Sequence, residues 1–261
     1  MTAKNGKTIS LVLGSGGARG LAHIGVIHVL EERGYEITSI AGCSVGALVG
    51  GIYAAGKLRE YEDWVRNVTR LDMVNMVDIS WVGGGLVKGD RIINKMIKLV
   101  GNRLIEELPI RFTAVATELE SGREVWLSEG PLFDAIRSSC SLPLFFTPAR
   151  FKEKMLVDGG VVNPVPIAPV FDDHTDLTIA VNLGGKPQKE PHAEGRKYIG
   201  AYDVAYLVFD AMQSTIARQK LAAYPPDLVI EIPRDAARTF DIDRATELIE
   251  LGRKAAEAVL P

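Results

Sequence analysis

The segment most able to do chemistry is Gly42-Cys43-Ser44-Val45-Gly46, in which a serine stands between two glycines. This spacing is typical of a sharp turn from a strand into a helix, which projects the central hydroxyl into solvent. The flanks agree with such a turn, because the apolar segment 37–41 predicts a buried strand and 47–55, ended by Gly56, predicts a helix. Ser44 is therefore the candidate nucleophile. Cys43, which the turn would not project, is expected to pack as a small buried side chain.

A second glycine-rich segment, Gly14-Ser15-Gly16-Gly17-Ala18-Arg19-Gly20, lies between a strand predicted at 9–13 and a helix predicted at 21–33. Uncovered backbone N–H groups at a helix N-terminus form an anion site, which suits a phosphate or the oxyanion of an acyl-transfer intermediate. Arg19-Gly20-Leu21 stands where a P-loop has lysine and then serine or threonine, and Arg19 replaces the third glycine of a dinucleotide fingerprint. The segment thus favours an oxyanion hole. Arg19 itself either holds the loop, contacts an anionic substrate or lies on the surface.

An activated serine needs a base, and the chain has four histidines, His23, His28, His174 and His192. His23 and His28 are five residues apart on one predicted helix, so they do not form a metal pair on one face, and His28 is expected to pack against a neighbouring helix. The other two lie in polar segments that are typical of surface loops.

The alternative base is Asp158, which ends a short apolar strand predicted at 155–157 and precedes Gly159 and Gly160. A carboxylate at such a position often only caps a turn. As a base it would act alone or orient His174 or His192, because the chain order Ser, Asp, His also fits a hydrolase triad. A free aspartate with a pKa near ~3.9 is a poor base, so a site that uses Asp158 must raise its pKa by desolvation.

These segments, taken in order together with Ala135–Pro143, resemble the blocks of the patatin-like phospholipases over about residues 9 to 170. Those proteins are serine lipid acyl hydrolases that use a Ser-Asp dyad without a histidine. The resemblance implies that Ser44 is the nucleophile, that Asp158 is the base and that the amides of Gly16 and Gly17 form the oxyanion hole. Ser15 stands where many members have a further glycine, but it keeps the amide. The residues that would shape the surrounding loops are Gly14, Ala18, Arg19, Gly42, Gly46, Gly159 and Gly160.

Apolar strand segments alternate with helical segments along the chain, which favours an α/β class with a mostly parallel sheet. The turn Glu120-Ser121-Gly122 indicates a hairpin and one antiparallel edge. The resemblance implies the patatin-like three-layer fold, with helices on both faces of the central sheet, as a single catalytic domain over residues 1–261. An apolar helical stripe is expected to cover the core, and a partner-binding helix is the alternative. The stripe is formed by Val204, Leu207, Val208, Ala211, Met212 and Thr215. The expected strands are Ile9–Leu13, Ile37–Ala41, Arg111–Ala116, Glu124–Leu127, Met155–Val157, Leu177–Val181 and Leu228–Ile232.

Composition narrows the class of protein. A formal net charge of −3 at pH 7 gives no basic surface for nucleic acid. Two cysteines make no disulfide framework, and there is neither a secretory leader nor an apolar run of ~18 residues, so a cytoplasmic protein is expected. No cluster of histidine, cysteine or acidic residues has metal-site spacing, so neither a metal nor another cofactor is expected.

Residues 57–105 form an insertion between the elbow helix and the next sheet strand. Met73, Met76 and Trp81 lie in it beside Gly83-Gly84-Gly85. Flexible thioethers and aromatics next to three glycines favour a movable lid that meets acyl chains and, transiently, a membrane surface. Ordinary core packing explains the same residues equally well.

The sequence therefore predicts a lipid acyl ester hydrolase, of phospholipase A, lysophospholipase or carboxylesterase type. Its expected partner is a lipid or acyl ester. Two other functions stay open: an acyltransferase that uses the same dyad, and a regulatory or membrane-surface binding module with the same fold and little turnover. The sequence indicates neither the head group, the chain length nor the oligomeric state.

Overall fold

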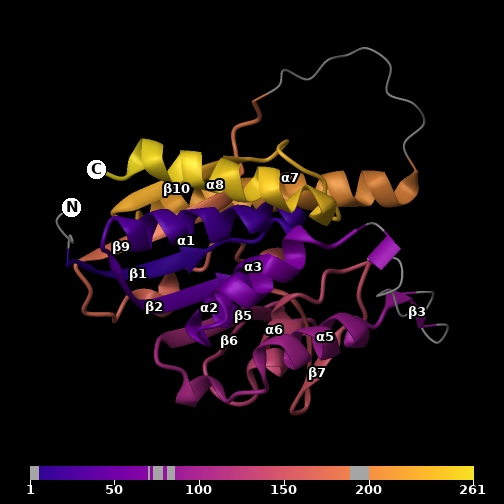
Figure 1. The fold of residues 1–261 in the computed structure, drawn as a ribbon. Coiled ribbons are helices and arrows are strands. Elements are labelled where there is room, and N and C mark those ends of the chain that lie inside the picture. The colour runs from indigo at the N-terminus through magenta and orange to yellow at the C-terminus, as the bar shows by residue number, and fades with distance from the viewer. Residues whose placement is uncertain (1–5, 70, 73–78, 81–85, 189–199) are drawn as a thin grey trace.

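A computed structural model describes residues 6–69, 71–72, 79–80, 86–188 and 200–261 (Figure 1). Within these residues an eight-stranded sheet forms the centre, and five adjacent strands in the order β10-β9-β1-β2-β5 are parallel. The mostly parallel sheet that the sequence predicts is thus confirmed. The strands of this sheet are β1 (Thr8–Leu13), β2 (Glu36–Cys43), β5 (Arg111–Glu118), β6 (Glu124–Leu127), β7 (Ala149–Phe151), β8 (Lys154–Asp158), β9 (Leu177–Gly185) and β10 (Leu228–Pro233). A separate small pair joins β3 (Ile79–Ser80) to β4 (Leu86–Val87).

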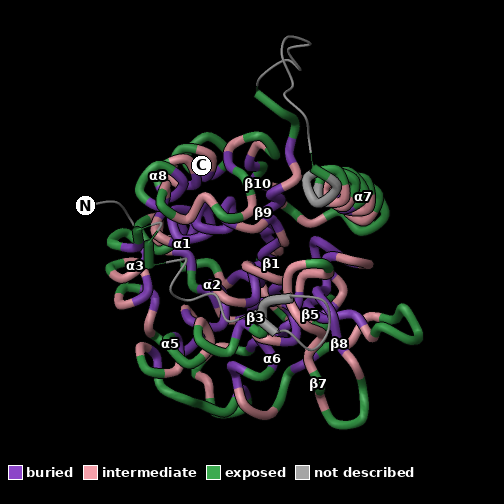
Figure 2. The backbone as a smooth tube through the Cα atoms, turned by 90° about the vertical axis from the view of Figure 1, so that its right-hand side faces the viewer, coloured by how far each residue is buried: buried purple, intermediate pink, exposed green. Residues whose placement is uncertain are grey.

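Helices lie on both faces of the sheet, as expected for the three-layer fold. Along β1, Leu11 and Leu13 belong to the main core cluster, whereas Val12 belongs to a second cluster with Ala217. Figure 2 shows α7 on the side of the strands away from α8. The α-helices are α1 (Ala22–Glu32), α2 (Val45–Ala54), α3 (Leu58–Arg66), α5 (Asp90–Val100), α6 (Leu132–Ser139), α7 (Ala201–Ala223) and α8 (Ala245–Val259). The 3₁₀ helices are η1 (Gly17–Leu21), η2 (Ile105–Glu107), η3 (Gly159–Val161), η4 (Ala168–Val170) and η5 (Ile242–Arg244). None of the described helices has the length and apolar character needed to cross a bilayer.

Strand β5 brings two distant parts of the chain end to end. Its residues 111–115 pair with β2, and residues 116–118 pair antiparallel with β8. Strand β6 pairs with residues 114–117 and overlaps both, so it occupies the opposite edge of β5. Strand β8 therefore pairs with the part of this edge of β5 that lies beyond the end of β2. The register places Asp158, opposite Ala116, next in line after Cys43, which is opposite Val115.

Of the two hairpins beside β5, only one was predicted from the sequence. The β5–β6 hairpin predicted from Glu120-Ser121-Gly122 is confirmed. The β7–β8 hairpin was not predicted, because β7 spans only Ala149–Phe151 and carries no clear period-two pattern. As a result the strand that ends in Asp158 runs antiparallel to β5.

The apolar stripe on α7 does not cover the core, and that expectation is wrong. Val204, Leu207, Val208 and Met212 are between 48% and 55% exposed. The face of α7 that turns inward instead meets β9 and the second cluster, against which Leu221 packs. Its buried residues include Gln213 and Ala217.

The insertion at 57–105 contributes partly to the core. Tyr61 and Val65 of α3 and Met96 of α5 are buried in the main cluster, and Trp64 packs against it. Met73, Met76, Trp81 and residues 83–85 lie outside the described residues. The lid therefore stays a prediction.

Helices α1 and α8 pack with their backbones in close approach. A Cβ added to Gly25 would lie 1.9 Å from the carbonyl oxygen of Ile249, and one added to Gly252 would lie 1.9 Å from that of Ala22. Neither position has room for a methyl group unless the two helices separate. The two glycines therefore fix α1, which follows directly on the glycine-rich loop.

We expect Gly252→Ala to lower the free energy of unfolding by about 1–3 kcal/mol, because the helices must move apart to admit the methyl group. Denaturant unfolding followed by circular dichroism measures the change. Lys254→Ala on the same helix is the control and should stay within about 0.5 kcal/mol, since Lys254 is exposed. An unchanged stability in Gly252→Ala would contradict the close approach.

Candidate active site

Ser44 lies in the turn between β2 and α2, with φ 54° and ψ −125°. This left-handed backbone is unfavourable for a serine and is typical of a nucleophile elbow. The flanking glycines make the turn possible, because a Cβ on Gly42 would lie 2.6 Å from the nitrogen of Ala47 and one on Gly46 would lie 2.1 Å from the carbonyl oxygen of Leu13. The strand-turn-helix context predicted for Ser44 is present.

Ser139, at the end of α6, holds the elbow in place. Its hydroxyl accepts a hydrogen bond from the Ser44 N–H at 2.9 Å and donates one to the Val115 carbonyl at 2.6 Å. The hydroxyl is buried, so both bonds are sheltered from water. Sequence reasoning assigned Ser139 no role. The only signal was its place inside the segment 135–143, which resembles a family block.

Two amides of the glycine-rich loop have no hydrogen-bond acceptor in the part of the chain that the structure describes. The N–H groups of Gly14, Ser15 and Ala18 donate to the carbonyls of Val181, Pro164 and Thr239. No acceptor for the N–H groups of Gly16 and Gly17 is found among the described residues. These are the two amides that the family resemblance assigns to an oxyanion hole.

The same loop packs directly on the elbow. A Cβ on Gly20 would lie 2.2 Å from Cγ1 of Val45, the residue after Ser44, and one on Gly46 would lie 2.8 Å from the Gly14 carbonyl oxygen. Gly17 has φ +57°, and a Cβ there would lie 2.8 Å from Cα of Thr239. The absence of side chains thus lets the loop, the elbow and the chain after β10 meet.

Asp158 is fully buried, and its two carboxylate oxygens differ. Oδ1 accepts the Gly160 N–H at 2.7 Å and lies 3.9 Å from Sγ of Cys43, which is buried as predicted. Oδ2 is also buried but accepts no hydrogen bond from the described residues. The turn-capping function and a free carboxylate oxygen therefore coexist in one side chain. Behind it, a Cβ on Gly159 would lie 2.2 Å from the Val115 carbonyl oxygen.

Burial raises the pKa of Asp158 from its ordinary value of 3.8 to about 6, and the Ser44 hydroxyl, the Gly160 N–H and the Cys43 thiol lower the pKa in part. The Ser44 hydroxyl thus lies close enough to stabilise the carboxylate, although the two groups form no hydrogen bond of standard geometry. Such a bond often tightens only when substrate is present. A carboxylate with this pKa is ionised at neutral pH and accepts a proton more readily than a free aspartate.

Each described histidine either contacts a group other than Ser44 or lies at the opposite end of the sheet. His23 is buried, and its Nε2 lies 2.9 Å from the Gly14 carbonyl oxygen, which makes it an anchor of the loop. His28 contacts the neighbouring helix α3, as expected, with its Nε2 3.0 Å from a carboxylate oxygen of Glu62. His174 is exposed near the N-terminal end of β1, opposite the end where Ser44 lies. His192 lies outside the described residues.

Arg19 is not a surface residue. It is 3% exposed, and its Nε donates to the Gly16 carbonyl at 3.0 Å. Of the three interpretations left open by the sequence, the structure supports the one in which Arg19 holds the loop.

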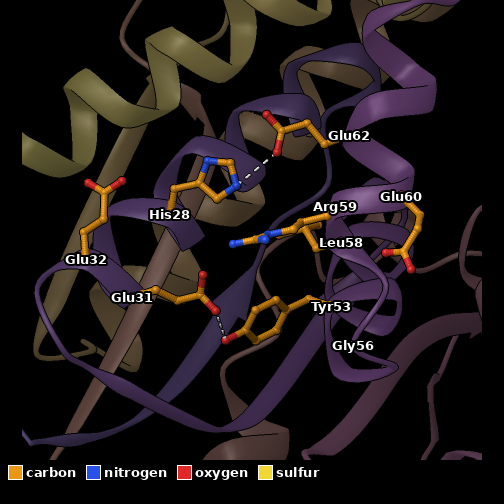
Figure 3. A pocket seen from close by; sticks show the side chains of 9 residues that line it. All are labelled: His28, Glu31, Glu32, Tyr53, Gly56, Leu58, Arg59, Glu60 and Glu62. Carbon is orange, nitrogen blue, oxygen red and sulfur yellow. Dashed lines mark hydrogen bonds and ion pairs between the residues drawn. The ribbon is translucent and has the colours of Figure 1, made fainter.

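A cavity of about 760 Å³ lies elsewhere, between α1, α2 and α3 (Figure 3). Figure 3 shows Arg59 extending into it, while Glu62 contacts His28 and the Tyr53 hydroxyl donates to Glu31 at 2.9 Å. The cavity holds neither Ser44 nor Asp158. Its polar groups connect the helices that line it.

The strain at Ser44 predicts a difference in stability between two variants that both lack its hydroxyl. Ser44→Gly should be about 1 kcal/mol more stable than Ser44→Ala, because glycine adopts the left-handed backbone without strain. Both variants lack the hydroxyl, so each is the control for the other. Thermal unfolding measures the difference, and equal midpoints would contradict a strained elbow.

The stability of the fold should also depend on the ionisation of the buried Asp158 carboxylate. The folded protein keeps the Asp158 proton up to about pH 6 while the unfolded chain loses it near 3.8, so ionisation of Asp158 destabilises the fold as pH rises between these values. His23 acts oppositely, because burial lowers its pKa from 6.5 to about 4 and the fold loses stability as pH falls through this range.

We therefore expect Asp158→Asn to become more stable relative to wild type as pH rises from 4 to 7, by on the order of 3 kcal/mol. Denaturant unfolding of both proteins across this range measures the difference, and shared groups such as His23 cancel. A difference that does not depend on pH would show that Asp158 is not desolvated.

Known proteins are similar to this chain over the region that contains Ser44 and Asp158. A family model described as patatin-like phospholipase matches residues 11–171. The fungal proteins named lysophospholipase NTE1 from Coccidioides immitis and Saccharomyces cerevisiae are 27% and 29% identical over 95% and 73% of this chain. The matched region makes up only 17% and 12% of those proteins. Among solved structures, VipD from Legionella pneumophila has 13% identity and a TM-score of 0.45, over 97% of this chain and 66% of that chain.

An uncharacterized NTE family protein of Mycobacterium tuberculosis is 35% identical over 97% of this chain and 91% of that protein. The model match covers more than half of the chain and includes Ser44, Asp158 and the glycine-rich loop. The chain belongs to the patatin-like phospholipase family.

Proposed function

We propose that this protein is a serine-dependent lipid acyl hydrolase whose catalytic domain spans residues 1–261. The observation that carries the proposal is the pairing of Ser44, on a strained elbow, with a buried carboxylate that keeps one oxygen without a hydrogen-bond donor. No described histidine offers an alternative base, since those in the described chain are engaged elsewhere or lie at the other end of the sheet.

In the proposed reaction the Ser44 oxygen attacks the ester carbonyl carbon while Asp158 takes the hydroxyl proton. The carbonyl oxygen becomes an oxyanion and accepts the N–H groups of Gly16 and Gly17. When the tetrahedral intermediate collapses, the bond to the leaving alcohol breaks and Asp158 returns the proton to that alcohol. Water then attacks the acyl group on Ser44 with Asp158 again as base, which releases the fatty acid and restores the serine.

The energetics of this dyad depend on both loops. A carboxylate with a pKa of about 6 is still a weak base for a serine hydroxyl, so proton transfer must be driven by stabilisation of the oxyanion. An oxyanion-hole donor typically contributes a factor of about 10²–10³ in rate. The two uncommitted amides are therefore as necessary to the proposal as Asp158 itself.

An apolar rim beside the oxyanion loop supports a lipid substrate. Phe240 follows Thr239, whose carbonyl accepts the Ala18 N–H, and its ring centroid lies 5.1 Å from that of Phe145. Phe240 and Leu144 are 48% and 51% exposed, which is typical of a surface that meets acyl chains. Because the fungal relatives are named lysophospholipases, we propose lysophospholipids as the first substrates to test. The free, partly or fully buried thiols of Cys43 and Cys140 agree with the proposed cytoplasmic location.

We expect Ser44→Ala and Asp158→Asn each to reduce hydrolysis of a lysophospholipid by more than about 10³-fold, and the double variant to lose little more because the residues act as a unit. A fluorophosphonate label should modify wild-type Ser44 and not the Ser44→Ala variant. Mass spectrometry of the labelled peptide and of the released fatty acid measures both outcomes.

The matched controls are His174→Ala and His192→Ala, which should stay within a few-fold of wild type. A loss of roughly 10³-fold in either, with folding intact, would replace the dyad by a triad. A wild-type protein that neither takes the label nor releases fatty acid would instead favour a binding module. Transfer of the acyl group to an added alcohol in preference to water would identify an acyltransferase.

A further inference from the structure

Arg19 connects the oxyanion loop to two segments far away in the sequence. Its Nε donates to the Gly16 carbonyl at 3.0 Å, Nη1 donates to the Arg234 carbonyl at 2.5 Å, and Nη2 meets Oδ1 of Asp210 at 2.6 Å. The side chain is 3% exposed, so the guanidinium charge is desolvated and needs a counter-charge. Asp210, on the inner face of α7, supplies the one ion pair recorded for Arg19 in the described chain.

The hydrogen bond from Arg19 to the Gly16 carbonyl determines the direction of the Gly17 N–H. The Gly16 C=O and the Gly17 N–H belong to one peptide unit, and the described chain contains no cis peptide bond. In a trans unit these two groups point in opposite directions. By holding the carbonyl, Arg19 therefore aims the Gly17 N–H away from the guanidinium, while the Ala18 N–H is fixed on Thr239.

Asp210 in turn determines where the guanidinium lies. A carboxylate at 2.6 Å forms a charge-assisted bond, which is stronger than a bond to a neutral carbonyl and anchors the end of the side chain. Without this charge, the desolvated cation would be expected to turn toward water or other acceptors. The Gly16–Gly17 peptide would then lose its fixed orientation.

The next turn of α7 touches the same site. Gln213 is three residues after Asp210 and so shares its helix face. Its Nε2 donates to the Ser15 hydroxyl at 3.2 Å and lies 2.0 Å from the position of a Cβ on Gly160. One face of α7 thus contacts both the oxyanion loop and the turn that holds Asp158.

From these contacts we infer that Asp210 is a positioning residue, which keeps the oxyanion hole in shape through Arg19. Asp210 lies outside the segment that the family model matches, so the hole assembled within residues 11–171 depends on a helix beyond it. The inference rests on the proposed hydrolase function and adds a residue to it.

The test is Asp210→Asn, which is nearly isosteric and removes the charge. We expect kcat for a lysophospholipid to fall about 10-fold to 100-fold with KM nearly unchanged, because an oxyanion hole binds the transition state and not the ground state. A trifluoromethyl ketone that adds to Ser44 and leaves an oxyanion should lose affinity by the factor lost in kcat/KM. The matching secondary alcohol, which Ser44 does not attack, should bind as before.

Two further variants separate this function from general stability. Arg19→Lys keeps a cation for Asp210 but lacks the Nε–H donor, so it should show the same selective loss and serves if Asp210→Asn does not fold. Gln219→Ala on the exposed face of α7 is the matched control and should keep wild-type kcat. Thermal unfolding of each variant shows whether a loss reflects the folded enzyme.

Equal losses of ketone and alcohol affinity would indicate a disrupted pocket and overturn the inference. So would wild-type kcat and ketone affinity in both Asp210→Asn and Arg19→Lys. In these two cases wild-type hydrolysis and Ser44 labelling remain intact, and the proposed function stands. A wild-type protein that neither hydrolyses the ester nor binds the ketone overturns the proposed function and this inference together.

Discussion

The arrangement on which the site depends is the shared edge of β5. Strand β2 pairs with the first part of this edge and β8 with the last part, from opposite directions. Ser44 follows the end of β2, and Asp158 ends β8, so two chain segments more than 100 residues apart bring the candidate nucleophile and base to one point. The rigid hydrogen-bonded ladder gives both groups a fixed origin. Burial of Asp158 and its raised pKa follow from that meeting.

The site carries several unfavourable features together. Ser44 has a left-handed backbone, Asp158 is ionisable and fully buried, and His23 is buried with Nδ1 lacking a hydrogen-bond partner in the described chain. Each such feature costs on the order of 1–3 kcal/mol. They persist because the surrounding structure is over-determined, with Ser139 holding the elbow and paired glycines bringing α1 against α8. Strain of this kind is typical of functional sites.

The two faces of the sheet contribute differently. The face under α1, α2 and α8 holds most of the apolar core, whereas the face under α7 has a small cluster that includes Val12 and Ala217. The inner face of helix α7 also meets the loops of the candidate site, through Asp210 and Gln213. Its outer stripe is exposed and apolar. Its inner face touches both loops, so the position of α7 bears directly on the geometry of the candidate site.

The sequence by itself determined the elements and the local turns. Gly42 and Gly46 around Ser44, the uncovered amides of the glycine-rich loop and the apolar segments before them are local patterns, and local sterics and periodicity decide them. The sequence did not determine which residues far apart along the chain come into contact. That Oδ1 of Asp158 caps a turn while Oδ2 stays free, that His174 lies at the wrong end of the sheet, and that Arg19 is paired with Asp210 depend on strand register and helix packing. The apolar stripe of α7 shows the limit most plainly, because periodicity identifies a helix face but only tertiary structure decides whether that face meets the core or solvent.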